Sequence, residues 1–201
     1  MARFTREQIQ KAVESKGYKY FTTDNYDINI VGIRNSDTNG KVTNKFDDWV
    51  TLSYKDENGK WFYHEFEATT DPGSHWEKNL LSTDGVAILV PGQYRGSHTI
   101  GLHQGKYEAL KQQKPLKVYR DKDKDGIYDF LEENIKEGIY GINIHRASAT
   151  GTSVQIDKWS AGCQVIANNT NFDKLMEVAN KAATIWGKSF TYTLIESKDI
   201  K

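Results

Sequence analysis

The amino-acid sequence predicts an α+β fold that is mostly β-sheet, with one helix near the N-terminus and another after residue 163. Short apolar and β-branched runs fill the middle of the chain and are separated by Gly, Pro, Asn and Asp, a pattern typical of strands joined by turns. Apolar residues recur at helical spacing near the two ends of the chain. A length of 201 residues without internal repeats or a low-complexity linker fits one domain.

Residues 5–14 are predicted to form the first helix. Thr5 can cap its N-terminus, and Gln8 three positions later completes a capping-box pattern. Ile9 and Val13 lie four positions apart, so they are expected on one face of the helix. Gly17 follows and is expected to end it.

The sequence then changes to the two-residue period of a β-strand, with Ile28, Ile30 and Gly32 at alternate positions. A β-hairpin is predicted around the segment Asp56–Gly59, because apolar runs flank this turn-like sequence. The strands of the hairpin are expected at Trp49–Tyr54 and Trp61–Phe66, and further strands at Val86–Val90, Leu116–Tyr119, Ile139–His145 and Phe190–Ile195.

Two more helices are expected in the second half of the chain. A short polar helix is predicted near Phe130–Lys136. A longer helix is indicated by apolar residues at positions 172, 175, 176 and 179, and Asn171 or Thr170 can cap it.

The composition excludes several classes of protein. Lys and Arg together number 27, as do Asp and Glu, so no net charge attracts the chain to nucleic acid. Only 37% of residues are hydrophobic, and the sequence contains no apolar run long enough to insert into a membrane. Residues 1–11 are polar and lack the apolar stretch of a secretory signal, so we expect any export to use another route.

The chain has one cysteine, which excludes an internal disulfide and any multi-cysteine metal site. A nucleophilic thiol needs a base and donors for the developing oxyanion. Small residues in the segment Ser160–Cys163 allow a tight turn that presents N–H groups to a carbonyl oxygen. His145, at the end of a predicted strand, is the candidate base. The alternative interpretation is that Cys163 is an apolar core residue, because free cysteine is among the most buried residue types.

The order of these residues resembles the catalytic domain of the L,D-transpeptidases of bacterial cell-wall metabolism. The signature of that family is a histidine, a loop of limited length and then Ser/Thr-His-Gly-Cys; here it reads His145, fourteen residues and Ser160-Ala161-Gly162-Cys163. The order strand, loop, cysteine, helix and strand also fits. Ala161 stands where the family usually has histidine. Gln164-Val165 replaces an apolar residue followed by Arg or Asn.

The resemblance covers mainly residues 141–195, with a weaker similarity over 69–94. It implies mixed sheets of L,D-transpeptidase type, with residues 61–201 as the catalytic region. Residues 1–60 do not share the resemblance, and their residue patterns predict an N-terminal helix and β elaboration of the same domain. The resemblance further implies that Cys163 is the nucleophile and His145 the base, that the Gly162 and Cys163 N–H groups are oxyanion donors, and that Ser160 supplies a supporting hydroxyl. Ala161 would lie in the substrate-binding segment.

Arg146, directly after the histidine, is a further departure from the family. It can hold a substrate carboxylate or lower the pKa of the thiol. The alternative is a solvated arginine at the start of a loop.

The activity implied by the resemblance is acyl transfer on peptidoglycan stem peptides through a Cys163 thioester. Catalysis is expected to need no cofactor and to take place at the bacterial cell wall or in the periplasm, in a bacterial or phage protein delivered without a signal peptide. Transpeptidation and hydrolysis, by a carboxypeptidase or endopeptidase, remain open. The alternative is a catalytically inactive, calcium-stabilised structural or binding module, for example in a phage particle.

An Asp-rich segment has the spacing of an EF-hand calcium loop. Calcium prefers six to eight oxygen ligands, and alternate carboxylates, a glycine turn and a final glutamate can supply them. The alternative is a solvated acidic turn neutralised by nearby lysines and an arginine. The ligand positions would be Asp121, Asp123, Asp125, Ile127 through its carbonyl, Asp129 and Glu132.

Overall fold

The first helix, α1 (Arg6–Ser15), begins at the predicted capping box. In the computed structural model, which describes residues 3–201, the Thr5 hydroxyl accepts from the Gln8 N–H and the Gln8 side chain accepts from the Thr5 N–H. Ile9 and Val13 share the buried face, as predicted, and pack on the outer side of the main sheet. The helix ends just before Gly17, which has a φ of 76°.

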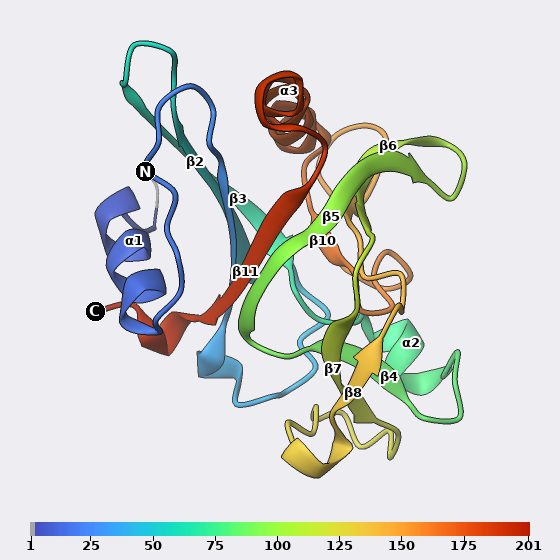
Figure 1. Ribbon diagram of the computed structural model, residues 1–201. Helices are drawn as coiled ribbons and strands as arrows, with labels where there is room; N and C mark the ends of the chain where they lie inside the picture. The colour runs from blue at the N-terminus through green and yellow to red at the C-terminus, as the bar shows by residue number, and fades with distance from the viewer. Residues whose placement is uncertain (1–2) are drawn as a thin grey trace.

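Eight strands form a closed sheet, so the fold is mixed α+β and mostly strands (Figure 1). Their order around the sheet is β1-β11-β5-β6-β9-β10-β3-β2. The strands that fall within residues 1–60 therefore belong to the same sheet as the strand of His145. The bounds are β1 (Asn29–Arg34), β2 (Asp48–Lys55), β3 (Trp61–Thr69), β5 (Gly92–His103), β6 (Tyr107–Gln112), β9 (Ile144–Arg146), β10 (Gln164–Ile166) and β11 (Phe190–Glu196).

Strand β1 is buried on both faces, although its sequence alternates. Ile30 packs inside the closed sheet, while Val31 and Ile33 pack against α1. The hairpin of β2 and β3 is confirmed, with Lys55 paired to Trp61 across the turn. The hairpin of β5 and β6 was not predicted from the sequence, because glycines interrupt β5 and most of its side chains are only partly buried.

A second, three-stranded sheet lies on the side of the molecule away from α1, beside the short helix α2 (Figure 1). The predicted strands at Val86 and Leu116 form part of it. The predicted polar helix near Phe130–Lys136 is replaced by one 3-10 turn and a strand, because residues 136–138 pair with β7 instead of continuing a helix. The bounds are β4 (Val86–Leu89), β7 (Leu116–Asp121), β8 (Lys136–Gly138), α2 (Ser74–Lys78) and the 3-10 helices η1 (Ser36–Thr38), η2 (Glu132–Asn134) and η3 (Ser197–Asp199).

The strand that contains His145 is shorter than predicted. We expected it to begin at Ile139, but β9 begins at Ile144. Gly141 has a φ of 73°, which breaks the extended conformation. The side-chain oxygen of Gln112 accepts hydrogen bonds from the N–H groups of Tyr140 and Ile142, at 3.0 and 2.9 Å, in place of a strand partner.

The long helix α3 (Asn169–Trp186) follows the cysteine as expected. Its N-cap is Asn168 rather than Asn171 or Thr170, because the Asn168 side chain accepts from the Asn171 N–H. Phe172 and Leu175 on its apolar face are buried in the main core with the strand residues. No helix within residues 3–201 is both long enough and apolar enough to cross a membrane.

Candidate active site

His145 and Cys163 lie on neighbouring parallel strands. In the register of β9 and β10, Val165 is opposite His145 and Gln164 is opposite Ile144. The Gln164 N–H donates to the Asn143 carbonyl at 2.9 Å, which extends the ladder towards the cysteine. Because side chains alternate along a strand, Cys163 is expected on the face that Val165 and His145 share.

The Cys163 thiol does not bond to His145 in this structure. Its Sγ donates to the carbonyl oxygen of Gly141, at 3.2 Å, in the irregular segment before β9. The cysteine is partly buried. Gly162 before it has a φ of 128°, and a Cβ atom at this position would overlap the carbonyl oxygen of Ala87. Only glycine fits this turn.

Ser160 is fully buried and holds the turn together. Its hydroxyl donates to the Cys163 carbonyl at 2.8 Å and accepts from the Gly162 N–H at 3.1 Å. The Gly162 N–H, expected as an oxyanion donor, is therefore occupied by Ser160. The Cys163 N–H makes no backbone or side-chain hydrogen bond within residues 3–201, which leaves it available as a donor.

A buried glutamine after the cysteine was not identified from the sequence. The Gln164 amide donates to the carbonyl oxygens of Gly162 and Thr70, both at 3.3 Å, and its oxygen accepts from the Tyr192 hydroxyl at 2.7 Å. The carbonyl and N–H of a trans peptide point in opposite directions. Anchoring the Gly162 carbonyl on Gln164 therefore fixes the direction of the Cys163 N–H.

His145 is oriented by a backbone carbonyl. Its Nδ1 lies 2.7 Å from the carbonyl oxygen of Arg146. A carbonyl only accepts, so Nδ1 carries the proton and Nε2 is left as the acceptor. The Tyr107 hydroxyl lies 3.3 Å from both Nδ1 and the same carbonyl. This arrangement, a histidine held in one tautomer by a third group, is what a general base requires.

The thiol and the imidazole are both neutral at rest. Burial, and secondarily the nearby His103, lowers the pKa of His145 to about 3. Burial raises the pKa of the Cys163 thiol to about 11. Proton transfer from the thiol to the imidazole is thus unfavourable before substrate is present. The site can perform chemistry only if attack and proton transfer are coupled or if the thiol leaves the Gly141 carbonyl.

A pocket of about 650 Å³ opens beside His145. The guanidinium of Arg146 lies 4.3 Å above the ring of Tyr107, which holds this cation at the pocket wall. Trp159 is 44% exposed and lines the pocket. His103 also lines this pocket.

Ala161 lines a different, smaller pocket of about 200 Å³. The two pockets share no lining residue. The predicted substrate-binding positions Arg146 and Ala161 therefore line separate pockets.

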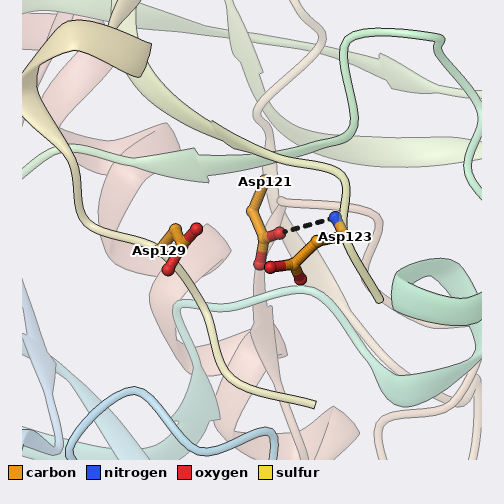
Figure 2. Close-up of side chains that lie close together, drawn as sticks. All are labelled: Asp121, Asp123 and Asp129. Atoms are coloured by element: carbon orange, nitrogen blue, oxygen red, sulfur yellow. Dashed lines mark hydrogen bonds between the residues drawn. The ribbon is translucent and has the colours of Figure 1, made fainter. Parts of the chain in front are cut away.

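The Asp-rich loop brings together three of its six predicted ligands. Asp121, Asp123 and Asp129 each offer a carboxylate oxygen, and these oxygens lie within 4.8 Å of one another. Figure 2 shows Asp121 and Asp123 side by side, with Asp129 on the following segment. Asp121 is buried, and its burial, followed by the charges of Asp123 and Asp129, raises its pKa.

The carboxylates of two other predicted ligands, Asp125 and Glu132, do not join this cluster. The carboxylate of Asp125 accepts from the Ile127 N–H at 2.8 Å, so it is turned to its own backbone. Glu132 begins the 3-10 helix η2. Ile127, whose carbonyl is the remaining predicted ligand, forms an isolated bridge with Lys41 in which the Gly126 carbonyl, not that of Ile127, accepts from the Val42 N–H. The segment that enters the loop is the strand β7, as its sequence predicted. In an EF-hand the loop is entered by a helix instead.

Comparison of the chain with models of protein families, with curated proteins and with solved structures gives no match.

Proposed function

We propose that this protein is a cysteine-dependent acyltransferase or peptidase that acts through Cys163 and His145. The observation that supports the proposal most is the bond between His145 Nδ1 and the Arg146 carbonyl, 2.7 Å long, in a histidine on the strand next to the cysteine. It leaves Nε2 as a proton acceptor at the wall of a pocket large enough for a peptide segment.

In the proposed reaction the thiol sulfur of Cys163 bonds to the substrate carbonyl carbon while its proton passes to His145 Nε2. The resulting oxyanion accepts from the Cys163 N–H, whose direction Gln164 fixes. The carbon–nitrogen bond then breaks, and the leaving amine takes the proton from His145. A second nucleophile, water or an amine, gives its proton to His145 and attacks the thioester, and the proton then returns to the thiolate.

The proposed substrate class follows from the resemblance to L,D-transpeptidases and is a peptidoglycan stem peptide. An amine acceptor would make the reaction a transpeptidation, and water would make it a carboxypeptidase or endopeptidase reaction. Such a protein would act at the bacterial cell wall or in the periplasm. Arg146, fixed by Tyr107, is suited to hold a carboxylate of the stem.

Intact-mass spectrometry after incubation with purified muropeptides tests this proposal. The wild type is expected to show an acyl adduct and released product, and Cys163→Ala neither. The product mass distinguishes cross-linking from hydrolysis. Cys163→Ser is a matched variant that keeps the shape of the side chain but replaces the thiol by a hydroxyl. It is expected to be at least about 100-fold slower, because a hydroxyl is a much weaker nucleophile than a thiolate. Turnover retained in Cys163→Ala would contradict the proposal.

A second candidate function is an inactive structural or binding module. The bond from the thiol to Gly141 and the raised pKa of Cys163 favour it, because such a thiol is unreactive at rest. Alkylation with iodoacetamide separates the two. If muropeptide leaves the rate of Cys163 alkylation unchanged and no adduct forms, the module is supported; if bound muropeptide alters this rate and an adduct forms, the enzyme is supported.

We also propose that the Asp-rich loop binds a structural calcium ion through Asp121, Asp123 and Asp129. Three carboxylates within 4.8 Å repel one another, and a divalent cation would remove this repulsion. The loop follows β7 and precedes β8, so the ion would stabilise the smaller sheet rather than contact substrate.

A further inference from the structure

Arg120 on β7 has a buried hydrogen-bond donor without an acceptor. Its Nε atom is buried and has no partner, and within residues 3–201 only one other buried side-chain atom, His64 Nε2, shares this condition. A buried donor that is left unsatisfied costs about 1–3 kcal/mol, and the known explanations are strain, a bound water or ion, and a catalytic role. The guanidinium of Arg120 therefore needs an explanation.

The guanidinium is fixed in place by neutral groups. One terminal nitrogen donates to the Gly85 carbonyl at 3.1 Å, and the group lies 4.5 Å above the ring of Tyr140. No carboxylate within residues 3–201 forms a salt bridge with it. Asp84, whose pKa is lowered mainly by Lys136 and also by Arg120, forms its salt bridge with Lys136, at 2.8 Å. The guanidinium of Arg120 is thus preorganised and has no salt-bridge partner of its own within residues 3–201.

Arg120 lines the smaller pocket, of about 200 Å³. The other walls are largely apolar and include Trp76, Leu81, Val86 and Ala161. The pocket is therefore suited to a small aliphatic group with one negative charge.

The pocket adjoins the cysteine turn. Ala161 lies two residues before Cys163 and forms part of the wall. Ala87, also in the wall, has its carbonyl oxygen against Gly162. Tyr140, under the guanidinium, precedes Gly141, whose carbonyl accepts the thiol. The segments 140–141 and 161–163 therefore contribute both to the wall of the pocket and to the surroundings of the Cys163 sulfur.

We propose that this pocket binds the departing amino acid of the substrate, with its terminal carboxylate on Arg120 and its short side chain against Trp76 and Ala161. This inference rests on the proposed function, in which a D-amino acid leaves from the stem. It assigns a specificity: the enzyme would act on stems whose last residue is small and has a free carboxylate. The rest of the stem would then lie in the larger pocket beside His145.

Two substrates that differ in one group test the inference. A tetrapeptide stem ending in D-alanine is compared with the same stem ending in D-alaninamide, and kcat/KM is measured from the mass of the released amino acid or amide. The wild type is expected to prefer the free acid by about 10- to 100-fold, the range expected for one charge-assisted pair. Arg120→Gln is expected to lose this preference, because kcat/KM falls only for the stem that ends in the free acid. Arg120→Lys is expected to retain part of the preference.

The ratio of the two substrates is independent of how much variant is folded, so a loss of stability in Arg120→Gln does not affect it. Arg95→Gln, which removes an arginine that lines a separate pocket, is the matched control and is expected to keep the wild-type preference. Equal turnover of both substrates by the wild type, or a preference that persists in Arg120→Gln, would overturn the inference.

A binding measurement separates this inference from the proposed reaction. D-Alanine and D-alaninamide are titrated into Cys163→Ala, and the indole N–H resonance of Trp76, which donates to the Lys158 carbonyl at 3.2 Å, is followed by NMR. Binding of D-alanine at least about 10-fold tighter than the amide, lost in the double variant with Arg120→Gln, supports the pocket even if no turnover occurs. Equal or absent binding, with turnover intact, overturns the pocket and leaves the reaction.

Discussion

The imidazole rings of His103 and His145 stack with their centroids 4.1 Å apart and 21° between their planes. His103 ends β5 and His145 lies on β9, so two strands that are not neighbours in the closed sheet place these rings in contact. Two stacked rings cannot both hold a proton without strong repulsion. The Asn143 side chain lies 3.2 Å from His103 Nδ1 and helps to hold the second ring.

Replacing His103 is expected to shift the pH dependence of the reaction. Burial, and then His103, lowers the pKa of His145, so His103→Gln should raise this pKa. A general base must be neutral, so the acidic limb of the pH profile of kcat/KM is expected to move to higher pH in this variant. Burial still keeps the pKa of His145 below that of a free histidine. The matched control is His64→Gln, which lies on β3 and should leave the limb unchanged. An unchanged limb in His103→Gln would count against His145 as the titrating base.

Acid is expected to destabilise the protein through His98. This histidine is fully buried, its Nε2 lies 3.0 Å from the Ile142 carbonyl, and burial lowers its pKa to about 4. The folded state favours the neutral ring of His98. The stability that this preference contributes is complete above about pH 6.5, the pKa of a free histidine, and is lost as the pH falls towards 4, the pKa in the folded protein. The loss between pH 7 and pH 4 is on the order of 3 kcal/mol.

Urea unfolding at pH 7 and pH 4 checks this loss. His98→Asn removes the titrating ring and should lower stability at pH 7 but reduce the difference between the two pH values. If wild type and variant lose equal stability on acidification, another group is responsible.

The Gln164–Tyr192 bond is expected to contribute to both stability and catalysis. Gln164→Leu leaves the Tyr192 hydroxyl and the Gly162 carbonyl without buried partners, which should cost about 2–4 kcal/mol. A double-mutant cycle with Tyr192→Phe, followed by urea unfolding, should give a coupling energy of about 1 kcal/mol or more. Tyr192→Phe leaves the Gly162 carbonyl bonded, so it should reduce kcat less than Gln164→Leu. Equal reductions would argue against an orienting role for Gln164.

Calcium is expected to raise the melting temperature. At a calcium concentration about 100 times the dissociation constant, a site present only in the folded state adds about 3 kcal/mol, or roughly 5–10 °C for a chain of this size. Asp121→Asn and Asp123→Asn should abolish the increase, whereas Asp37→Asn, an acidic residue outside the cluster, should keep it. Thermal unfolding with calcium and with EDTA measures the effect. An equal increase in all four proteins would indicate binding elsewhere.

The sequence determined the features that depend on near neighbours. The capping box of Thr5 and Gln8, the hairpin turn at Asp56–Gly59 and the apolar face of α3 were predicted because each is built from residues a few positions apart. The spacing of His145 and the cysteine loop indicated that the two would return to one place, and the parallel pairing of β9 and β10 brings their strands together.

Only the tertiary structure decided the state of the candidate site. The burial that keeps Cys163 and His145 neutral, the stacking of His103 and the bond of Gln164 to Tyr192 all come from segments tens of residues apart. The late start of β9 likewise depends on Gln112, whose side chain accepts hydrogen bonds from the backbone N–H groups of Tyr140 and Ile142. Local propensity fixes where a helix or turn begins. Desolvation and long-range hydrogen bonds determine the protonation state and orientation of the side chains in the site. Both arise only when distant segments pack together.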